Sequence, residues 1–198
     1  TQGEKGTLGD EKDRAKEAAA AGEVMGLAWR GNLSLPDSAL EHVQPSKLKI
    51  AEVIRGTRPE LVILPHWEQR HPDHLACSKL GYDACFFAGL KKMELDGVPH
   101  RPRKIIYASY YRNHDYSFLV DISDVFDQKC RAVAAYESQF GGSQISKTVF
   151  QPGADIYNLM RVHDGWLGSR VGVQYAEAYT IKEHMLVDDP QKMPVASI

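Results

Sequence analysis

The sequence predicts an α/β fold built on a mainly parallel sheet. The first observation is residues 61–64 (LVIL), a continuous apolar run between turn residues, which is typical of a strand buried on both faces. The second is Pro72, which follows a short loop and suits the first position of a helix, where a missing N–H costs nothing. The third is the alternation of strand-like and helix-like segments along the chain, which indicates parallel strands joined by helices.

Upstream of that strand, the pattern predicts a helix, a strand and a second helix. Residues 11–25 are rich in Ala, Glu and Lys, with acidic residues at the start and Gly26 just past the end, which are signals for the start and stop of a helix. Residues 27–35 have the pattern of a short strand, and residues 46–56 regain the helical spacing of apolar side chains.

Downstream, we expect the helix that starts at Pro72 to run to about residue 88. The remaining predicted elements are strands at residues 105–110 and 118–122 and helices at residues 124–140 and 156–167. The chain contains no internal repeat and no low-complexity linker. Residues 1–198 are therefore expected to form one domain, with a polar tail from about residue 187.

Composition and charge narrow the class of protein. With 198 residues, 43% hydrophobic and 25% charged, the chain resembles an ordinary globular domain. Its 24 basic and 26 acidic residues are mixed along the chain and give a net charge of -2, so we expect no nucleic-acid partner. No apolar run reaches the roughly 20 residues of a membrane span, and the first residues lack the apolar core of a signal peptide. These features predict no membrane partner and a cytoplasmic location.

The segment His71-Pro72-Asp73-His74 carries the most specific chemistry in the sequence. Its two histidines are three residues apart at a predicted helix start, so their side chains can share one face, and Asp73 can orient an imidazole. The segment follows a parallel strand, where α/β folds bind ligands. Imidazoles suit a catalytic zinc ion, which takes three protein ligands and a water. The competing interpretation is a helix cap with exposed polar side chains.

Several other polar residues have weaker signals. Asp37 follows a proline and is interpreted as a turn residue. His66 and Trp67 fall in the loop before the histidine pair, where they could shape a substrate. Glu4 lies in a Gly-rich loop and either lines the pocket or only belongs to the loop. Cys77 is left out of the site, because a buried helix cysteine is the commoner explanation.

The chain resembles the PIG-L or LmbE-like zinc deacetylases in five segments. These are TQGEKGTLG (1–9), NLSLPD (32–37), LVILPHWEQRHPDH (61–74), AYESQF (135–140) and VGVQYAEAY (171–179). The order and spacing of NLSLPD and AYESQF are most similar to the branch that deacetylates N-acetylglucosaminyl malate in bacillithiol biosynthesis. The resemblance implies a Rossmann-like three-layer sandwich that hydrolyses the acetamide of an N-acetylglucosamine conjugate with Zn2+ as cofactor.

The resemblance also implies roles for the histidine segment. His74 would ligate zinc. His71 would protonate the leaving group or stabilise the developing charge, and Asp73 would orient it.

Two further residue roles follow from the same resemblance. Arg14, in the first predicted helix, would contact the substrate, although the residues alone favour a solvated charge. A tyrosine late in the chain would help to hold the oxyanion, with Tyr157 as the nearest match and Tyr175 as the alternative.

One part of the family pattern has no counterpart in these residues. In the family, the other two zinc ligands and the general base come from an A-H-P-D-D-like loop after the first strand, and no His-x-x-Asp of that kind precedes Thr1. We therefore expect the sheet to lack its first strand and the zinc site to be incomplete. We also expect the 198-residue chain to be inactive on its own.

The sequence thus favours a zinc-dependent deacetylase of a small-molecule amino-sugar conjugate, assembled as a homo-oligomer as family members commonly are. The alternative is a non-catalytic carbohydrate-binding or assembly protein that keeps the fold without the metal. A nucleotide-binding protein is disfavoured, because TQGEKGTLG is neither a P-loop nor a G-x-G-x-x-G turn after a strand.

Overall fold

The computed structural model describes residues 1–6, 9–108, 115–141 and 155–195. Within them, one sheet has the strand order β1-β2-β4-β3. Its strands are β1 (Leu61–Pro65), β2 (Lys104–Ala108), β3 (Phe118–Asp121) and β4 (Ala176–Thr180). β1 and β2 run parallel, whereas β4 is antiparallel to both of its neighbours. The predicted α/β fold is confirmed, and the sheet is mixed rather than mainly parallel because β4, which was not foreseen as a strand, returns between β2 and β3.

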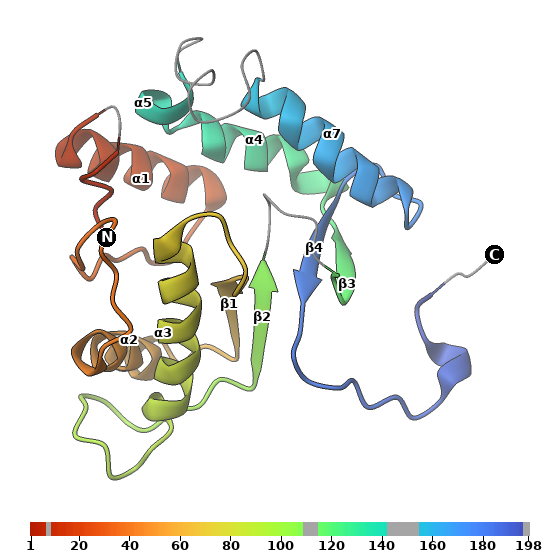
Figure 1. Ribbon diagram of the computed structural model, residues 1–198. Coiled ribbons are helices and arrows are strands. Elements are labelled where there is room, and N and C mark those ends of the chain that lie inside the picture. The colour runs from red at the N-terminus through yellow and green to blue at the C-terminus, as the bar shows by residue number, and fades with distance from the viewer. Residues whose placement is uncertain (7–8, 109–114, 142–154, 196–198) are drawn as a thin grey trace.

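Helices surround this sheet. They are α1 (Glu11–Met25), α2 (Gln44–Thr57), α3 (Pro72–Ala88), α4 (Phe126–Ala134), α5 (Glu137–Phe140) and α7 (Ile156–Ser169), with short 3-10 turns η1 (Ser123–Val125) and η2 (Pro190–Lys192). α2 and α3 pack on each other and α3 on β1, while α1 packs on α4 and α7 on β4 (Figure 1). In Figure 1, α1, α4, α5 and α7 lie at the upper end of the molecule, towards which β2 points. No helix of the described part of the chain is long and apolar enough to cross a bilayer.

Helix α1 forms where its sequence signals place it. The Asp10 carboxylate accepts hydrogen bonds from the N–H groups of Lys12 and Asp13, and the Asp13 carboxylate accepts one from the Asp10 N–H. This reciprocal capping satisfies donors that a helix start leaves unpaired. Gly26 ends the helix at φ 66°, a left-handed conformation that glycine adopts without strain.

The predicted strand at residues 27–35 is wrong. Its residues take no regular structure and are mostly exposed. Ser34 has a φ of 49°, and its N–H donates to the Asn32 side chain at 2.7 Å. A left-handed residue and a turn closed by an Asn side chain both interrupt an extended run.

The predicted helix at residues 124–140 is interrupted. It is divided into η1, α4 and α5, and Tyr136 leaves helical geometry between the last two, with a ψ of 65°. The Tyr136 hydroxyl accepts a hydrogen bond from Arg30 at 2.7 Å. The predicted strands at 105–110 and 118–122 correspond to β2 and β3, although residues 109–110 lie outside the described part of the chain.

Strand β1 is buried on one face only, which corrects the expectation that it is buried on both. Leu64 is 7% exposed and Val62 packs against the core between α2 and α3. Leu61 and Ile63, on the opposite face, are 43% and 53% exposed. β1 pairs only with β2 among the described strands, so it also forms an edge of the sheet. The apolar run predicted the strand correctly, but its surroundings depend on neighbours that periodicity does not reveal.

A buried ion cluster joins α4, α7 and β4. The Lys129 ammonium lies 2.7 Å from an Asp164 oxygen and 2.6 Å from a Glu177 oxygen. Asp164 is fully buried and also lies 2.9 Å from the His163 ring. The Tyr179 hydroxyl donates to Glu177 at 2.6 Å. Asp164 therefore has its charge compensated in a place that water does not reach.

Candidate functional site

His71 is the residue that caps the start of α3. Its backbone is extended, and its Nδ1 accepts the N–H of Asp73 at 3.1 Å. A neutral imidazole that accepts at Nδ1 carries its proton on Nε2. Because the ring is otherwise exposed, the Nε2–H group is available to a bound molecule.

His74 lies beside His71 on the first turn of α3. The two ring centroids are 5.2 Å apart. Partial burial lowers the pKa of His74, and the charge of His71 lowers it further, while Asp73 opposes the shift. The neutral form of His74 is therefore favoured, which is the form that binds a metal ion.

Asp73 holds a loop rather than a histidine ring in this structure. The side chain is 6% exposed. Its carboxylate accepts the N–H of Ser38 at 2.7 Å and the N–H of Leu40 at 3.2 Å. The loop that follows NLSLPD is thereby fixed against the start of α3.

Two acidic residues connect this loop to the N-terminal segment. The Asp37 N–H donates to Glu4 at 2.8 Å, and the Lys5 N–H donates to Asp37 at 3.0 Å. Burial acts most strongly on Asp37 and would raise its pKa, but hydrogen bonds with Lys5 and Thr1, followed by the charges of the N-terminus and of His71, bring the pKa below its usual value. The Asp37 hydrogen bond likewise lowers the pKa of Glu4. Both carboxylates are ionised and Asp37 is within electrostatic reach of His71.

Arg14 lies over the glycines of the N-terminal segment. A side chain at Gly6 would collide with the Arg14 guanidinium, and one at Gly3 would touch it. Gly3 also has a φ of 72°. The Arg14 Nε is buried and has no hydrogen-bond partner among the described residues. This arrangement places the Arg14 guanidinium against the N-terminal segment that carries Glu4.

The loop between β1 and α3 is held by stacked rings. His66 is 3% exposed and stacks on Trp67 with centroids 4.0 Å apart, and Trp67 meets the edge of Tyr107 at 4.8 Å. The Lys182 ammonium lies 4.7 to 4.9 Å from the ring centroids of Trp67, Tyr82 and Tyr107. A cation held over three rings is a stabilising contact, and it joins the loop to the segment that leaves β4. Trp67 therefore has a packing role.

The two tyrosines proposed for the oxyanion lie in the cluster between α4 and α7. Tyr157, on the first turn of α7, packs beside Ile156 and Met160. The Tyr175 ring stacks on Phe126 with centroids 3.7 Å apart. Within the described residues, neither hydroxyl is brought to His71 by a hydrogen bond. The structure thus does not place Tyr157 with the histidine pair.

The histidine pair does not amount to a complete metal site among the residues that the structure describes. No group of three His, Cys, Asp or Glu side chains that could hold an ion occurs within them. Burial raises the pKa of the Cys77 thiol, which favours the protonated form.

The structure therefore brings together His71, His74 and Asp73, and adds Glu4 and Asp37, which sequence patterns left as loop and turn residues. The sequence feature that points to Asp37 is the NLSLPD segment, which ends at this residue. A motif of this kind marks a loop but not the partner that the loop touches.

Comparison with known proteins shows what the histidine-bearing part of the chain is similar to. Residues 1–85, which contain the histidine pair, match the family described as PIG-L: GlcNAc-PI de-N-acetylase. The diacetylchitobiose deacetylase of Thermococcus kodakarensis is 34% identical over 134 residues, which are 64% of this chain and 49% of that protein. The chain thus spans about half the length of this curated relative.

Solved structures agree with the fold. A conserved protein of Thermus thermophilus superposes with a TM-score of 0.83 and 36% identity over 93% of this chain and 80% of that one. The N,N'-diacetylchitobiose deacetylase of Pyrococcus horikoshii gives a TM-score of 0.73 at 23% identity, covering 90% of this chain and 68% of that one. A 4-carboxy-2-hydroxymuconate hydratase of Pseudomonas putida gives 0.72 at 17% identity, covering 93% and 78%.

The last two likenesses concern the fold alone, since one fold can host different reactions. The Thermus likeness is closer in sequence and covers most of both chains. Residues 1–85, which are less than half of the chain, thus match the PIG-L family, and the chain as a whole shares its fold with the Thermus protein.

Proposed function

We propose that the protein is a metal-dependent deacetylase that hydrolyses the acetamide of an N-acetylglucosamine conjugate. The observation that carries this proposal is the pair His71 and His74 at the start of α3, next to the carboxyl end of β1 and inside the matched range 1–85. Ligands of α/β folds bind at this edge of the sheet. The Thermococcus relative, named a diacetylchitobiose deacetylase, supports the same type of reaction.

His71 is proposed to serve the reacting amide. Its Nδ1 is engaged by the Asp73 N–H, so Nε2–H points away from the helix and can donate a hydrogen bond. A donor aimed at the carbonyl oxygen stabilises the negative charge that develops there, and the same proton can pass to the leaving amine. Asp73 acts indirectly in this scheme, by fixing the loop at Ser38 and Leu40.

Zinc is the proposed metal, with His74 as one ligand. A bound zinc ion would supply an activated water and polarise the amide carbonyl. The described residues offer no group of three ligands, so they do not by themselves fit a complete zinc site. The remaining ligands would have to lie outside the described residues, and we assign no catalytic step to the ion.

Arg14 and Tyr157 are proposed to contact the substrate. The Arg14 Nε has no partner among the described residues, and a guanidinium suits a carboxylate. This favours an acidic aglycone such as malate, in line with the NLSLPD and AYESQF segments. The Thermococcus relative makes diacetylchitobiose the second candidate. Tyr157 stays a proposed oxyanion contact.

Acetate release tests the proposed function. The 198-residue chain and the product of the full reading frame of its gene would be assayed with added Zn2+ on N-acetylglucosaminyl malate, N,N'-diacetylchitobiose and N-acetylglucosamine. We expect the full product to release acetate from a conjugate when Zn2+ is present. Activity of the 198-residue chain would show that its own residues complete the site. Sugar binding without acetate release from any substrate would instead support the non-catalytic carbohydrate-binding alternative.

Zinc retention provides a separate prediction. His74→Ala should remove most of the bound zinc, because a catalytic zinc site with one of three protein ligands missing leaves the ion largely to water. Metal analysis of the purified full product and its variant checks this. Cys77→Ser, which alters the next potential ligand on α3, should retain zinc. Stoichiometric zinc in His74→Ala would show that His74 is not a ligand.

A further inference from the structure

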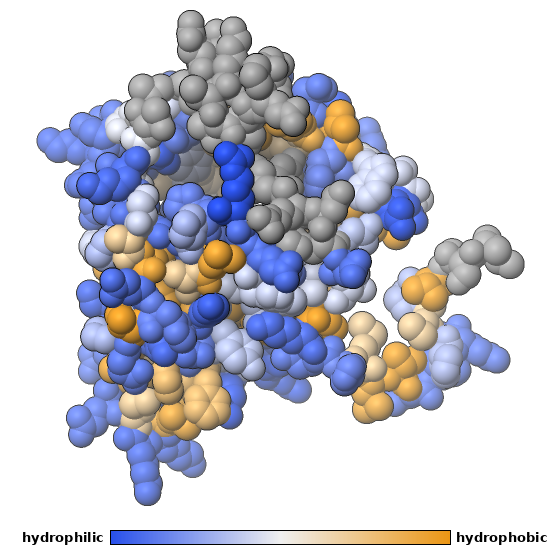
Figure 2. Space-filling model, viewed as in Figure 1, coloured by the Kyte–Doolittle hydropathy of each residue, from blue (hydrophilic) through white to orange (hydrophobic). Residues whose placement is uncertain are grey.

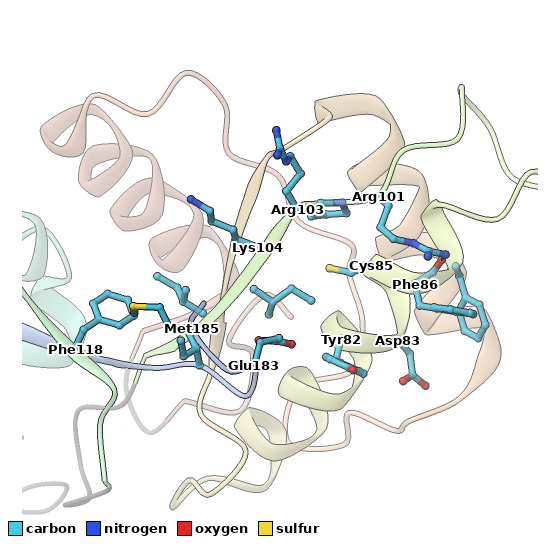
Figure 3. A pocket seen from close by; sticks show the side chains of 15 residues that line it. Tyr82, Asp83, Cys85, Phe86, Arg101, Arg103, Lys104, Phe118, Glu183 and Met185 are labelled. Atoms are coloured by element: carbon cyan, nitrogen blue, oxygen red, sulfur yellow. The ribbon is translucent and has the colours of Figure 1, made fainter. Parts of the chain in front are cut away.

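An apolar groove of about 880 Å³ is lined by the C-terminal half of α3, whereas the histidine pair lies at the start of that helix. It lies between α3, the first residues of β2 and the segment that follows β4. Figure 3 shows Tyr82 and Phe86 of α3 on one side and Phe118 and Met185 on the other. Phe86 is 52% exposed, so apolar surface is open to water here.

The groove lies beside the edge of β2 that faces β4, where only the end of β2 is paired. β4 pairs with Tyr107 and Ala108, the last residues of β2. Residues 104–106 have no strand partner on that edge among the described residues. An unpaired strand edge beside apolar side chains is a binding surface for an extended segment.

The groove is positively charged. Three basic residues line it, namely Arg101, Arg103 and Lys104. Of its two acidic residues, Asp83 is engaged by the Lys47 ammonium at 2.9 Å. Among the described residues, this leaves Glu183 as the only acidic lining residue outside an ion pair. An occupant with acidic and apolar residues would complement this surface.

The last described part of the chain has this composition. We define residues 186–195 as the arm, which extends away from the body (Figures 1 and 2). Leu186 is 90% exposed and Val195 68%, and Met193 is also exposed. Asp188 and Asp189 add two acidic charges, of which Asp189 lies 3.6 Å from the Lys192 ammonium of the same segment, so the arm carries a net negative charge centred on Asp188. Exposed apolar side chains on an extended segment indicate a missing contact.

We propose that the arm of one copy of this chain fills the groove of a second copy, and that the exchange is reciprocal. The segment that carries Ile181, Glu183 and Met185 lines the groove and continues directly into the arm at residue 186. In a two-fold dimer the arm–groove contact occurs twice, so the surface area buried by one contact is doubled. Leu186 enters the apolar part while Asp188 and Asp189 face the basic rim. This pairing is independent of the proposed deacetylation.

Sedimentation of the 198-residue chain over a range of concentrations tests the pairing. The chain should form a dimer, and Leu186→Asp should weaken it. Reversing the charges of the arm (Asp188→Lys with Asp189→Lys) or of the groove (Arg101→Glu with Arg103→Glu) should each raise the dimer dissociation constant about tenfold or more, because like charges then meet. Combining both reversals in one chain should restore the dimer.

A matched pair of substitutions on α1, Lys12→Glu with Lys16→Glu, makes the same change of charge far from the groove and should leave the dimer intact. Circular dichroism of every variant separates loss of pairing from loss of folding. A chain that stays monomeric at all concentrations overturns the proposal. A dimer that survives both charge reversals also overturns the proposal. The same holds if combining the arm and groove reversals in one chain does not restore the dimer.

Discussion

His71→Ala should lower kcat about 10²- to 10⁴-fold while the zinc content stays near that of the wild type, which is the range expected for a lost proton donor. The reason is the hydrogen bond that fixes the ring: Nδ1 is held by the Asp73 N–H, and Nε2–H is the group left to meet the substrate. Steady-state kinetics and metal analysis on the full product check this. Loss of zinc would make His71 a ligand, and an unchanged kcat would reduce it to a helix cap.

His71→Asn is the matched control, because His71 also caps α3. Removing the cap with Ala should cost about 0.5 to 2 kcal/mol of stability, whereas Asn is among the best capping residues. Asn should therefore restore the melting temperature but not kcat. Recovery of kcat with the melting temperature would contradict a catalytic role.

Lys129→Met should be the most destabilising substitution considered, at about 3 to 5 kcal/mol in the free energy of unfolding, because among the described residues it leaves the fully buried Asp164 carboxylate with only the His163 ring beside it. Asp164 is fully buried, and the Lys129 ammonium is 2.7 Å from its carboxylate. Urea unfolding followed by circular dichroism measures the effect.

Lys47→Met serves as the comparison, since it also removes an ammonium from a carboxylate. Asp83, its partner at 2.9 Å, is 33% exposed and keeps contact with water and with His42. Exposed ion pairs contribute up to about 1 kcal/mol, so this variant should lose little. Equal losses in the two variants would show that burial of Asp164 is not what makes its pair important.

The sequence predicts elements best where the signal is local. The Asp10 cap and Gly26 define α1, and the apolar run at 61–64 identifies β1. Residues 27–35 show where local patterns mislead, because the left-handed Ser34 and its side-chain turn are set by backbone geometry that apolar spacing does not encode.

In the candidate site, too, contacts between sequence neighbours are predictable and contacts between distant segments are not. His71 and His74 are neighbours in sequence, so their pairing is predictable from helical spacing. The contact of Asp73 with the Ser38 N–H joins residues 35 positions apart, and the Asp37 contact with Glu4 joins residues 33 apart. Such contacts depend on how loops pack, which is why Asp37 was interpreted as a turn residue only.

The exposed face of β1 should make the purified protein prone to aggregation. β1 has one strand neighbour among the described residues, and Leu61 and Ile63 stand open beside its free edge. A strand edge of this kind accepts further strands from other molecules, and apolar side chains make the stacked product durable. Growth of β-sheet aggregates from this edge, faster at higher protein concentration, is therefore the way in which stored or heated samples should lose material first. A lysine in place of Ile63 would put a charge on that edge and slow such growth without touching α3.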